Sequence, residues 1–142
     1  MTEIGITFCY LVPELHHKSA RDICLGTEGT LCVILISGQA PTKSLKDEFE
    51  SLNAKYDRKI ERGSKYKFMW LNGSIEKKWA EVFGYDGNDK VVILNPGKRK
   101  RFTPHEGPIT KDDVSTTLET IIGGNARFTR VSELPTFEIR TE

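Results

Sequence analysis

The sequence predicts an α/β fold in which a central mixed β-sheet is flanked by helices, and three observations predict it. The continuously apolar, β-branched run Leu31–Ser37 has the character of a strand buried on both faces of a sheet. A long helical pattern separates it from a second strand pattern, which implies a right-handed parallel crossover. Two further strand patterns flank a tight turn and indicate an antiparallel hairpin.

The first expected element is a short helix over Ser19–Leu25, which Gly26 would end. After the buried strand, a long helix begins near Leu45, where Ser44 is a candidate N-cap, and Gly63 ends the pattern. Its apolar face is formed by residues at helical spacing, namely Leu45, Phe49, Leu52, Tyr56 and Ile60. This amphipathic pattern predicts a helix that covers one face of the sheet.

A second strand, alternating and aromatic, is expected over Tyr66–Leu71 and is ended by the turn signal Asn72-Gly73. A short helix then runs from about Ile75 to Phe83. Its apolar face holds Ile75, Trp79, Val82 and Phe83. Both tryptophans of the chain are therefore expected to lie in the core rather than on a ligand-binding surface.

The hairpin consists of strands over Lys90–Leu94 and Lys100–Thr103, joined by the turn Asn95-Pro96-Gly97. The last helix opens with the capping-box spacing of Thr110-x-x-Asp113 and ends at Gly123-Gly124. Its apolar face is formed by Val114, Leu118, Ile121 and Ile122. The two strands and the helix complete the predicted α/β fold.

The resulting order, α, β, long α, β, α, β, β, α, is that of a thioredoxin-like domain. We assign this domain to residues 19–125, with an N-terminal extension at 1–18 and an extended tail at 126–142. The tail contains Pro135 and lacks helical periodicity, so it is expected to dock in part through Phe128, Leu134 and Phe137. A chain of 142 residues is long enough to bury one core without a metal or a dense disulfide framework.

Composition excludes several classes of function. The formal net charge is +1 and 29% of the residues are charged, which argues against a dedicated nucleic-acid or membrane-surface binder. The longest apolar run is far shorter than the roughly 20 residues of a membrane-spanning helix. The opening residues lack the features of a secretory signal peptide, so the chain is expected to be cytosolic or a piece of a larger protein. No motif for a cofactor is present.

The junction between the buried strand and the long helix lacks the motif that thioredoxin-like enzymes carry there. A thioredoxin-like enzyme carries Cys-x-x-Cys there, whereas this chain reads Ser37-Gly38-Gln39-Ala40-Pro41-Thr42. Dithiol chemistry needs two sulfurs at a helix N-terminus, where the helix dipole lowers the pKa of the attacking thiol. The sequence therefore predicts a domain that binds but does not exchange disulfides.

The three cysteines lie elsewhere. Cys24 and Cys32 either form a structural disulfide across a short loop or stay separate, with Cys32 as a small buried hydrophobe and Cys24 as a free thiol. Cys9 has no nearby partner and is not a convincing nucleophile. The sequence leaves both states of the first pair open.

The remaining motifs have structural as well as functional explanations. Asn72-Gly73-Ser74 matches the acceptor pattern for N-glycosylation on a predicted turn, and it matters only in a secretory compartment. The basic run Lys98–Arg101 fits a solvated turn, with an acidic partner as the alternative. The histidines His16, His17 and His105 show no metal-ligand spacing, so no metal is expected.

Several segments between Asp22 and Glu133 together resemble a known family. They are, in order, Cys24–Leu35, Leu52–Tyr56, Phe68–Leu71, Phe83–Tyr85, Val91–Asn95, Lys100–Phe102 and Gly123–Ala126. In their order and spacing the chain is similar to the third, non-catalytic thioredoxin-like domain that follows two tandem catalytic domains in a subgroup of protein disulfide isomerases.

The resemblance implies residence in the endoplasmic reticulum lumen and a parent protein with isomerase activity. This domain would then bind unfolded or disulfide-containing substrates or chaperones. It also favours a disulfide between Cys24 and Cys32, because that compartment is oxidising. Binding is expected either through an apolar surface patch or at two loops, through Gln39, Ala40, Pro41, Thr42, Tyr85 and Asp86. The catalytic domains place a proline in the second loop, whereas this chain reads Asp86–Asp89 there, so the groove-lining loop has changed.

Two alternatives belong to other classes of protein. One is a cytosolic adaptor with the same fold that uses Lys98–Arg101 to bind an acidic partner. The other is an enzyme of the thioredoxin superfamily with a single reactive cysteine, which needs a low-pKa thiol near the N-terminus of the long helix.

Overall fold

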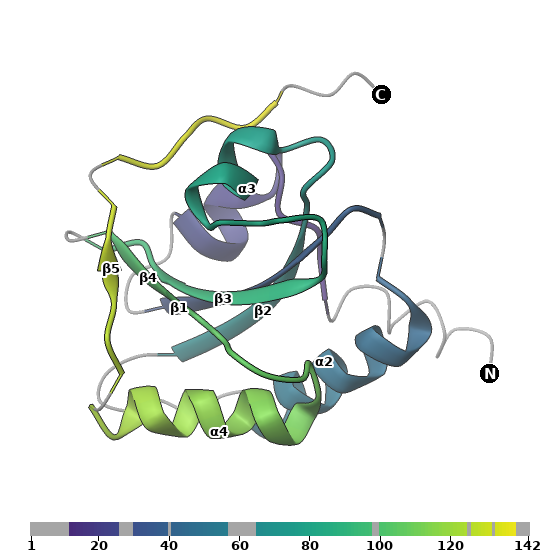
Figure 1. The fold of residues 1–142 in the computed structure, drawn as a ribbon, viewed down its shortest axis with the longest axis vertical. Coiled ribbons are helices and arrows are strands. Elements are labelled where there is room, and N and C mark those ends of the chain that lie inside the picture. Colours follow the sequence, from purple (N-terminus) through teal and green to yellow (C-terminus); the bar gives the residue numbers. More distant parts are fainter. Residues whose placement is uncertain are drawn as a thin grey trace.

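A five-stranded mixed sheet in the order β2-β1-β3-β4-β5 forms the centre of the described part of the chain (Figure 1). The computed structural model describes residues 12–25, 30–39, 41–56, 65–97, 100–124, 126–131 and 133–138. The strands are β1 (Thr30–Ser37), β2 (Lys65–Asn72), β3 (Lys90–Asn95), β4 (Arg101–Pro104) and β5 (Thr129–Arg130). Their order confirms the predicted α/β architecture with a central mixed sheet.

Helices cover both faces of this sheet. They are η1 (Arg21–Leu25), a short π-type helix, and the α-helices α2 (Lys43–Tyr56), α3 (Lys77–Val82) and α4 (Lys111–Ile122). Figure 1 shows α2 and α4 on one face, and α3 with η1, drawn in purple, on the other. The sheet is thus the middle of three layers, which explains the continuously apolar sequence of its central strand.

Strand pairing confirms the crossover and the hairpin. β1 and β2 are parallel, from Thr30 opposite Lys65 to Ser37 opposite Asn72. β3 is antiparallel to β1, and β4 is antiparallel to β3. Because β1 and β2 run the same way, their carboxyl ends lie side by side at one edge of the sheet, and the start of β3 lies beside them.

Every residue of β1 is buried, and its side chains alternate between two hydrophobic clusters. The cluster under α2 and α4 contains Val33, Leu35, Phe49, Leu52, Tyr56, Phe68, Val114 and Leu118, among others. The cluster under η1 and α3 contains Cys24, Cys32, Ile34, Ile36, Met69, Leu71, Trp79 and Phe83, among others. Burial of these side chains, at roughly 1.5–3 kcal/mol each, is the main stabilising contribution to the fold.

Helix starts differ from prediction in two places. Thr42, rather than Ser44, caps α2, because its Oγ1 accepts a hydrogen bond from the backbone N of Leu45 at 3.3 Å. Ile75 was expected on the buried face of α3, but it precedes the helix and is 39% exposed. The predicted end of the long helix, with Ile60 and Gly63, lies outside the described residues.

The cap of α4 confirms the sequence prediction. Thr110 Oγ1 accepts from the backbone N of Asp113 at 3.1 Å and donates to the Asp113 carboxylate at 2.7 Å. Gly123 follows the last residue of the helix, and Gly124 adopts a φ of 80°, which is the left-handed conformation common after a helix end.

Residues on the N-terminal side of η1 pair with the outer edge of β2. The backbone N of Leu15 donates to the Trp70 carbonyl at 2.7 Å, and the N of Trp70 donates to the Pro13 carbonyl at 3.0 Å. Val12 and Leu15 are buried. These residues therefore contribute to the core although they lie within the predicted extension 1–18.

The C-terminal segment is docked against the face that carries α3. β5 pairs with β4, a pairing that the sequence did not indicate because the strand is too short to show alternation. Further on, the Phe137 ring stacks on the Trp79 ring at a centroid distance of 4.5 Å. The backbone N of Glu138 donates to the buried Glu76 carboxylate at 2.9 Å. The tail thus closes the hydrophobic cluster over Trp79.

Phe137→Ala is expected to lower the free energy of unfolding by about 1–2 kcal/mol, because a half-buried aromatic side chain and its stacking on Trp79 are both lost. Urea denaturation measures the difference. Thr136→Ala is the control, since Thr136 is exposed and its truncation should change stability by no more than about 0.5 kcal/mol. Equal stabilities of the two variants would contradict the docking of the tail.

Candidate functional site

The loop between β1 and α2 lies at the junction where a thioredoxin-like enzyme carries Cys-x-x-Cys, a motif that this loop lacks. β1 ends at Ser37, Gly38 and Gln39 are exposed, and Pro41 is buried. Thr42 then caps α2, so the helix N-terminus is aimed at this loop. A helix N-terminus favours negative charge and backbone acceptors. The geometry of the loop is thus suited to binding, and it carries no sulfur.

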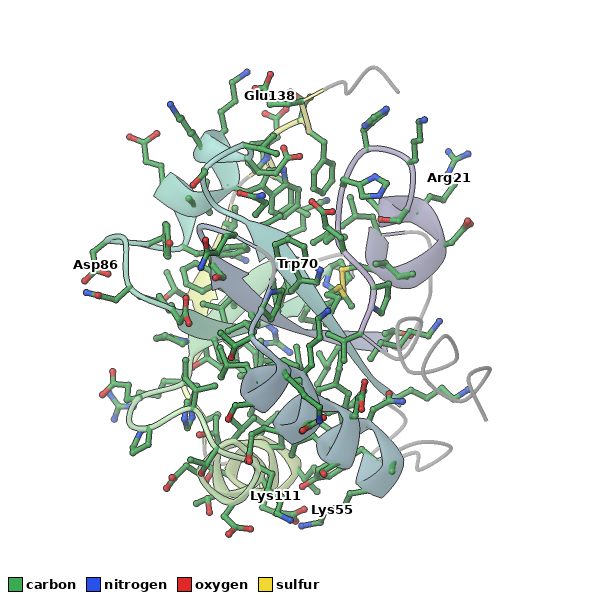
Figure 2. All side chains as sticks on the ribbon, turned by 90° about the vertical axis from the view of Figure 1, so that its right-hand side faces the viewer. Arg21, Lys55, Trp70, Asp86, Lys111 and Glu138 are labelled. Atoms are coloured by element: carbon green, nitrogen blue, oxygen red, sulfur yellow. A yellow bond between two sulfur atoms is a disulfide. The ribbon has the colours of Figure 1, made fainter. Side chains whose placement is uncertain are left out.

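The loop between α3 and β3 faces it across the sheet edge. Ile36 pairs with Lys90, so in antiparallel strands the residues before β3 continue beside the residues that follow β1. Gly84 and Gly87 have φ values of 74° and 103°, a conformation that glycine adopts without steric cost. Two tight bends therefore shape this loop, and Figure 2 shows Asp86 at its projecting tip.

The Tyr85 side chain joins the two loops. The backbone N of Tyr85 donates to the Ala80 carbonyl at 2.9 Å, and the Tyr85 ring lies against the turn after β2. The contact with Gly73 is so close that an added Cβ there would lie 2.7 Å from Tyr85 Cε2. A Cβ built on Gly38 would lie 3.4 Å from the Tyr85 hydroxyl. Glycine is thus required at position 73 by the ring that lies on it.

Together the loops enclose a cleft of about 300 Å³. It is lined by Ser37, Gly38, Gln39, Thr42, Gly87 and Asp89. A neighbouring hollow of about 230 Å³ lies on the other side of the second loop and shares Asp89 with the first. Hydroxyl, amide and carboxylate groups line the cleft, so it offers hydrogen-bond partners rather than an apolar pocket.

Only some of the predicted binding residues line the cleft. Gln39 and Thr42 line the cleft, whereas Tyr85 is not among its lining residues and lies beside Gly38 and on Gly73. Pro41 is buried, Asp86 lines the neighbouring hollow, and Ala40 lies outside the described residues. Gly87 and Asp89 also line the cleft, and the signal for them was their position directly before a strand antiparallel to β1.

Burial raises the pKa of the Tyr85 hydroxyl above its ordinary value of about 10, and the carboxylates of Asp89 and then Asp86 raise it further. The hydroxyl therefore stays protonated and able to donate. Because the unfolded state ionises first, the contribution of Tyr85 to stability is present below about pH 10 and is lost as the pH rises toward its folded-state pKa.

Asp89→Asn is expected to lower the pKa of Tyr85 toward the ordinary value, since it removes the larger of the two repelling charges. The titration of a ¹³C-labelled tyrosine ring, followed by NMR and assigned with Tyr85→Phe, measures it. Asp86→Asn should lower the pKa less, because its effect on Tyr85 is the smaller. An unchanged titration in Asp89→Asn would show that this carboxylate does not face the phenol.

The sulfur atoms lie away from the cleft. Cys24 and Cys32 are joined in a disulfide with a Cα–Cα distance of 5.8 Å, visible in Figure 2 as a yellow bond between η1 and the sheet. Both residues are 0% exposed. Roughly 16 Å of extended strand separates Cys32 from Ser37. The disulfide is therefore out of reach of a molecule bound at the cleft, and Cys9 lies outside the described residues.

Other candidate residues have structural partners. His105 is buried and donates from Nε2 to the Pro108 carbonyl at 2.8 Å, while its Nδ1 lies 2.6 Å from the Thr117 hydroxyl. Arg101 lies over the Phe128 ring, 5.1 Å from its centroid. Lys98 and Arg99 of the basic run lie outside the described residues. The described residues hold no group of side chains that could bind a metal ion.

Membrane insertion through a helix has no support within the described ranges. None of the helices there is both long enough and apolar enough to cross a bilayer.

Comparison with known proteins agrees with the fold. No model of a protein family matches the chain. Over 110 residues it is 24% identical to a Dictyostelium discoideum protein named "putative protein disulfide-isomerase", a match that covers 75% of this chain and 26% of that protein. The chain thus spans about a quarter of that relative's length.

Solved structures of low identity share the same architecture. The Trx4 domain of ERdj5 superposes with a TM-score of 0.61 at 11% identity, covering 80% of this chain and 97% of that domain. The fold is thioredoxin-like. The J-Trx1 fragment of ERdj5 gives a TM-score of 0.58 at 9% identity, covering 80% of this chain and 51% of the fragment. Chloroplastic thioredoxin z gives 0.52 at 14%, with coverages of 80% and 93%.

These similarities confirm the predicted fold class. The chain thus has a thioredoxin-like fold, and its sequence is similar to part of a protein named as a putative disulfide isomerase.

Proposed function

We propose that this domain is a non-catalytic, polypeptide-binding module of a protein disulfide isomerase in the endoplasmic reticulum lumen. The observation that carries the proposal is the polar cleft between the β1–α2 loop and the α3–β3 loop, at the junction where thioredoxin-like enzymes carry Cys-x-x-Cys; no cysteine is among the described residues that line it. In this proposal, disulfide formation and isomerisation belong to other domains of the parent protein.

The absence of thiols at the cleft supports a role without redox chemistry. Exchange needs a thiolate within reach of the bound disulfide. Position 39 is glutamine and position 42 is threonine, and the hydroxyl of Thr42 is engaged in capping α2. Cys24 and Cys32 are bonded to each other and buried. Neither Cys24 nor Cys32 can therefore serve as the attacking thiol at the cleft.

The lining of the cleft supports an extended polypeptide as the ligand. Backbone amides and carbonyls of a bound chain need partners when they leave water. The hydroxyl of Ser37, the amide of Gln39 and the carboxylate of Asp89 provide both donors and acceptors. Folded proteins keep most of their backbone groups paired, so an unfolded or misfolded substrate fits this chemistry better than a native one.

Two observations support the endoplasmic reticulum. A structural disulfide is typical of oxidising compartments and rare in the cytosol. The relative in Dictyostelium is named as a putative protein disulfide-isomerase, which agrees with an oxidising compartment.

Binding is tested with ¹⁵N-labelled protein and ribonuclease whose disulfides have been scrambled. We expect shift changes to cluster at the cleft, above all at Gln39, Gly87 and Asp89. The double variant Gln39→Ala/Asp89→Ala should bind about tenfold more weakly, because two hydrogen-bonding groups are lost. Lys67→Ala is the matched control, since Lys67 is exposed on β2 away from the loops. Shift changes confined to other surfaces would refute the cleft as the binding site.

Catalysis is tested separately by insulin reduction with dithiothreitol. The chain should show no rate above that of dithiothreitol alone, because the β1–α2 loop has no Cys-x-x-Cys and the described residues that line the cleft include no thiol. Clear turnover by the isolated chain would overturn the non-catalytic assignment and direct attention to Cys9.

A further inference from the structure

The chain holds one N-x-S/T triplet, Asn72-Gly73-Ser74, and the proposed binding role does not use it. β2 ends at Asn72, and the next three residues form a turn. An acceptor site for N-linked sugar must lie on a surface turn. The position of this triplet in the fold therefore meets the first structural requirement.

The Asn72 side chain has a defined orientation in this turn. Its Oδ1 accepts hydrogen bonds from the backbone N of Ser74 at 2.9 Å and of Ile75 at 3.3 Å. An oxygen must face these two donors, so the amide nitrogen Nδ2 points the other way. Nδ2 makes no hydrogen bond to any residue that the structure describes, and it is not among the buried polar atoms that lack partners there. The reactive atom is thus accessible.

The other two residues of the triplet differ in exposure, because Gly73 is buried against the Tyr85 ring. Ser74 is exposed, and its hydroxyl donates to the Gly38 carbonyl at 2.9 Å, a contact that belongs to the folded state. The bonds from Asn72 to Ser74 and Ile75 are local in sequence, so this turn can form before the sheet does. Glycine at position 73 leaves the turn without a side chain between acceptor and hydroxyl.

We propose that Asn72 is an acceptor for N-glycosylation when the chain enters the secretory pathway. The donor is a polyprenyl-diphosphate-linked oligosaccharide. A bond forms between Asn72 Nδ2 and C1 of the first sugar, the bond between that C1 and the diphosphate oxygen breaks, Nδ2 loses one proton, and the polyprenyl diphosphate leaves. No oxidant or reductant is needed.

The sugar would stand at the rim of the cleft. Asn72 lies directly opposite Ser37 in the β1–β2 pair, and Ser74 is hydrogen-bonded to Gly38. Ser37 and Gly38 both line the cleft. A branched sugar chain at this position borders the loop between β1 and α2, whereas Asp89 lies on the β3 side of the cleft. The glycan therefore limits approach to the cleft from the β2 side. This consequence for binding rests on the proposed binding role, and attachment in the cell rests on the proposed location in the endoplasmic reticulum.

The test directs the full chain into microsomes behind a cleavable signal peptide and follows its mobility with and without peptide N-glycosidase. We expect one enzyme-sensitive glycan on the unaltered chain. Asn72→Gln and Ser74→Ala should each abolish it, and Ser74→Thr should retain it, because threonine preserves the acceptor pattern.

Lys90→Thr supplies the positive control, because it creates a second acceptor pattern at Asn88 in an exposed loop. Modification at Asn88 with none at Asn72 would overturn the proposal, since the chain would then have met the transferase without reaction at the natural site. The assay scores sugar attachment alone, so a failure of the cleft to bind scrambled ribonuclease would leave its result unaffected.

Discussion

The double variant Gln39→Cys/Thr42→Cys is expected to reduce insulin disulfides at a rate clearly above that of the unaltered chain. The two substitutions place Cys-Ala-Pro-Cys at the junction between β1 and α2, next to the N-terminus of a described helix of 14 residues. A thiol in such a position has a pKa near 7 instead of 8.5, which raises the thiolate fraction at pH 7 by about tenfold. The insulin turbidity assay measures the gain.

Asp89 limits this gain. Its carboxylate lines the same cleft as positions 39 and 42, and a negative charge there raises the pKa of a nearby thiol. Adding Asp89→Asn to the double variant should therefore increase the rate at pH 7 and shift its pH profile to lower pH. The single variant Gln39→Cys is the control, because one thiol without a partner cannot complete the reduction. Equal rates for the single and double variants would show that the loop does not bring the two sulfurs together.

Regular elements could be predicted because burial imposes a period on the sequence. β1 lies in the middle layer and is apolar throughout, and α2 carries its buried residues at helical spacing. Features that have no such period were either not predicted or placed wrongly. β5 has two residues, and Ile75 falls outside α3 because that helix starts only at Lys77. Capping depends on how the chain enters the helix, so Thr42 and Ser44 could not be told apart from sequence.

The candidate site was predictable in outline because topology decides which loops meet. Once β3 is placed antiparallel to β1, the residues before β3 must lie beside the residues after β1. The role of each side chain was not predictable. Tyr85 stays a predicted binding residue, and the structure adds that its ring lies on Gly73, while Asp89 places a carboxylate at the cleft. Such contacts join residues from separate loops, and no local pattern records them.

Replacing both bonded cysteines, Cys24→Ala/Cys32→Ala, is expected to lower the free energy of unfolding by about 2.5 kcal/mol. The disulfide closes a loop between residues eight positions apart, and chain entropy in the unfolded state gives this magnitude. The bond also fixes η1 to the central strand, because Cys24 lies in η1 and Cys32 in β1. For a chain of this length the corresponding fall in Tm is roughly 5–10 °C. Urea denaturation and a thermal scan under oxidising conditions measure both.

Leu25→Ala is the matched control, since Leu25 neighbours Cys24 in η1 but is 37% exposed. This variant should lose no more than about 0.5 kcal/mol of unfolding free energy.

Burial of both sulfurs allows a second, kinetic test, because a reductant reaches a buried disulfide only after local unfolding. Native protein treated with dithiothreitol and iodoacetamide should therefore stay unlabelled at positions 24 and 32, and labelling should appear in urea. Rapid labelling of both positions in native protein would mean that η1 opens readily, and the stability of the face that carries α3 would then have to come from Trp79 and its neighbours instead.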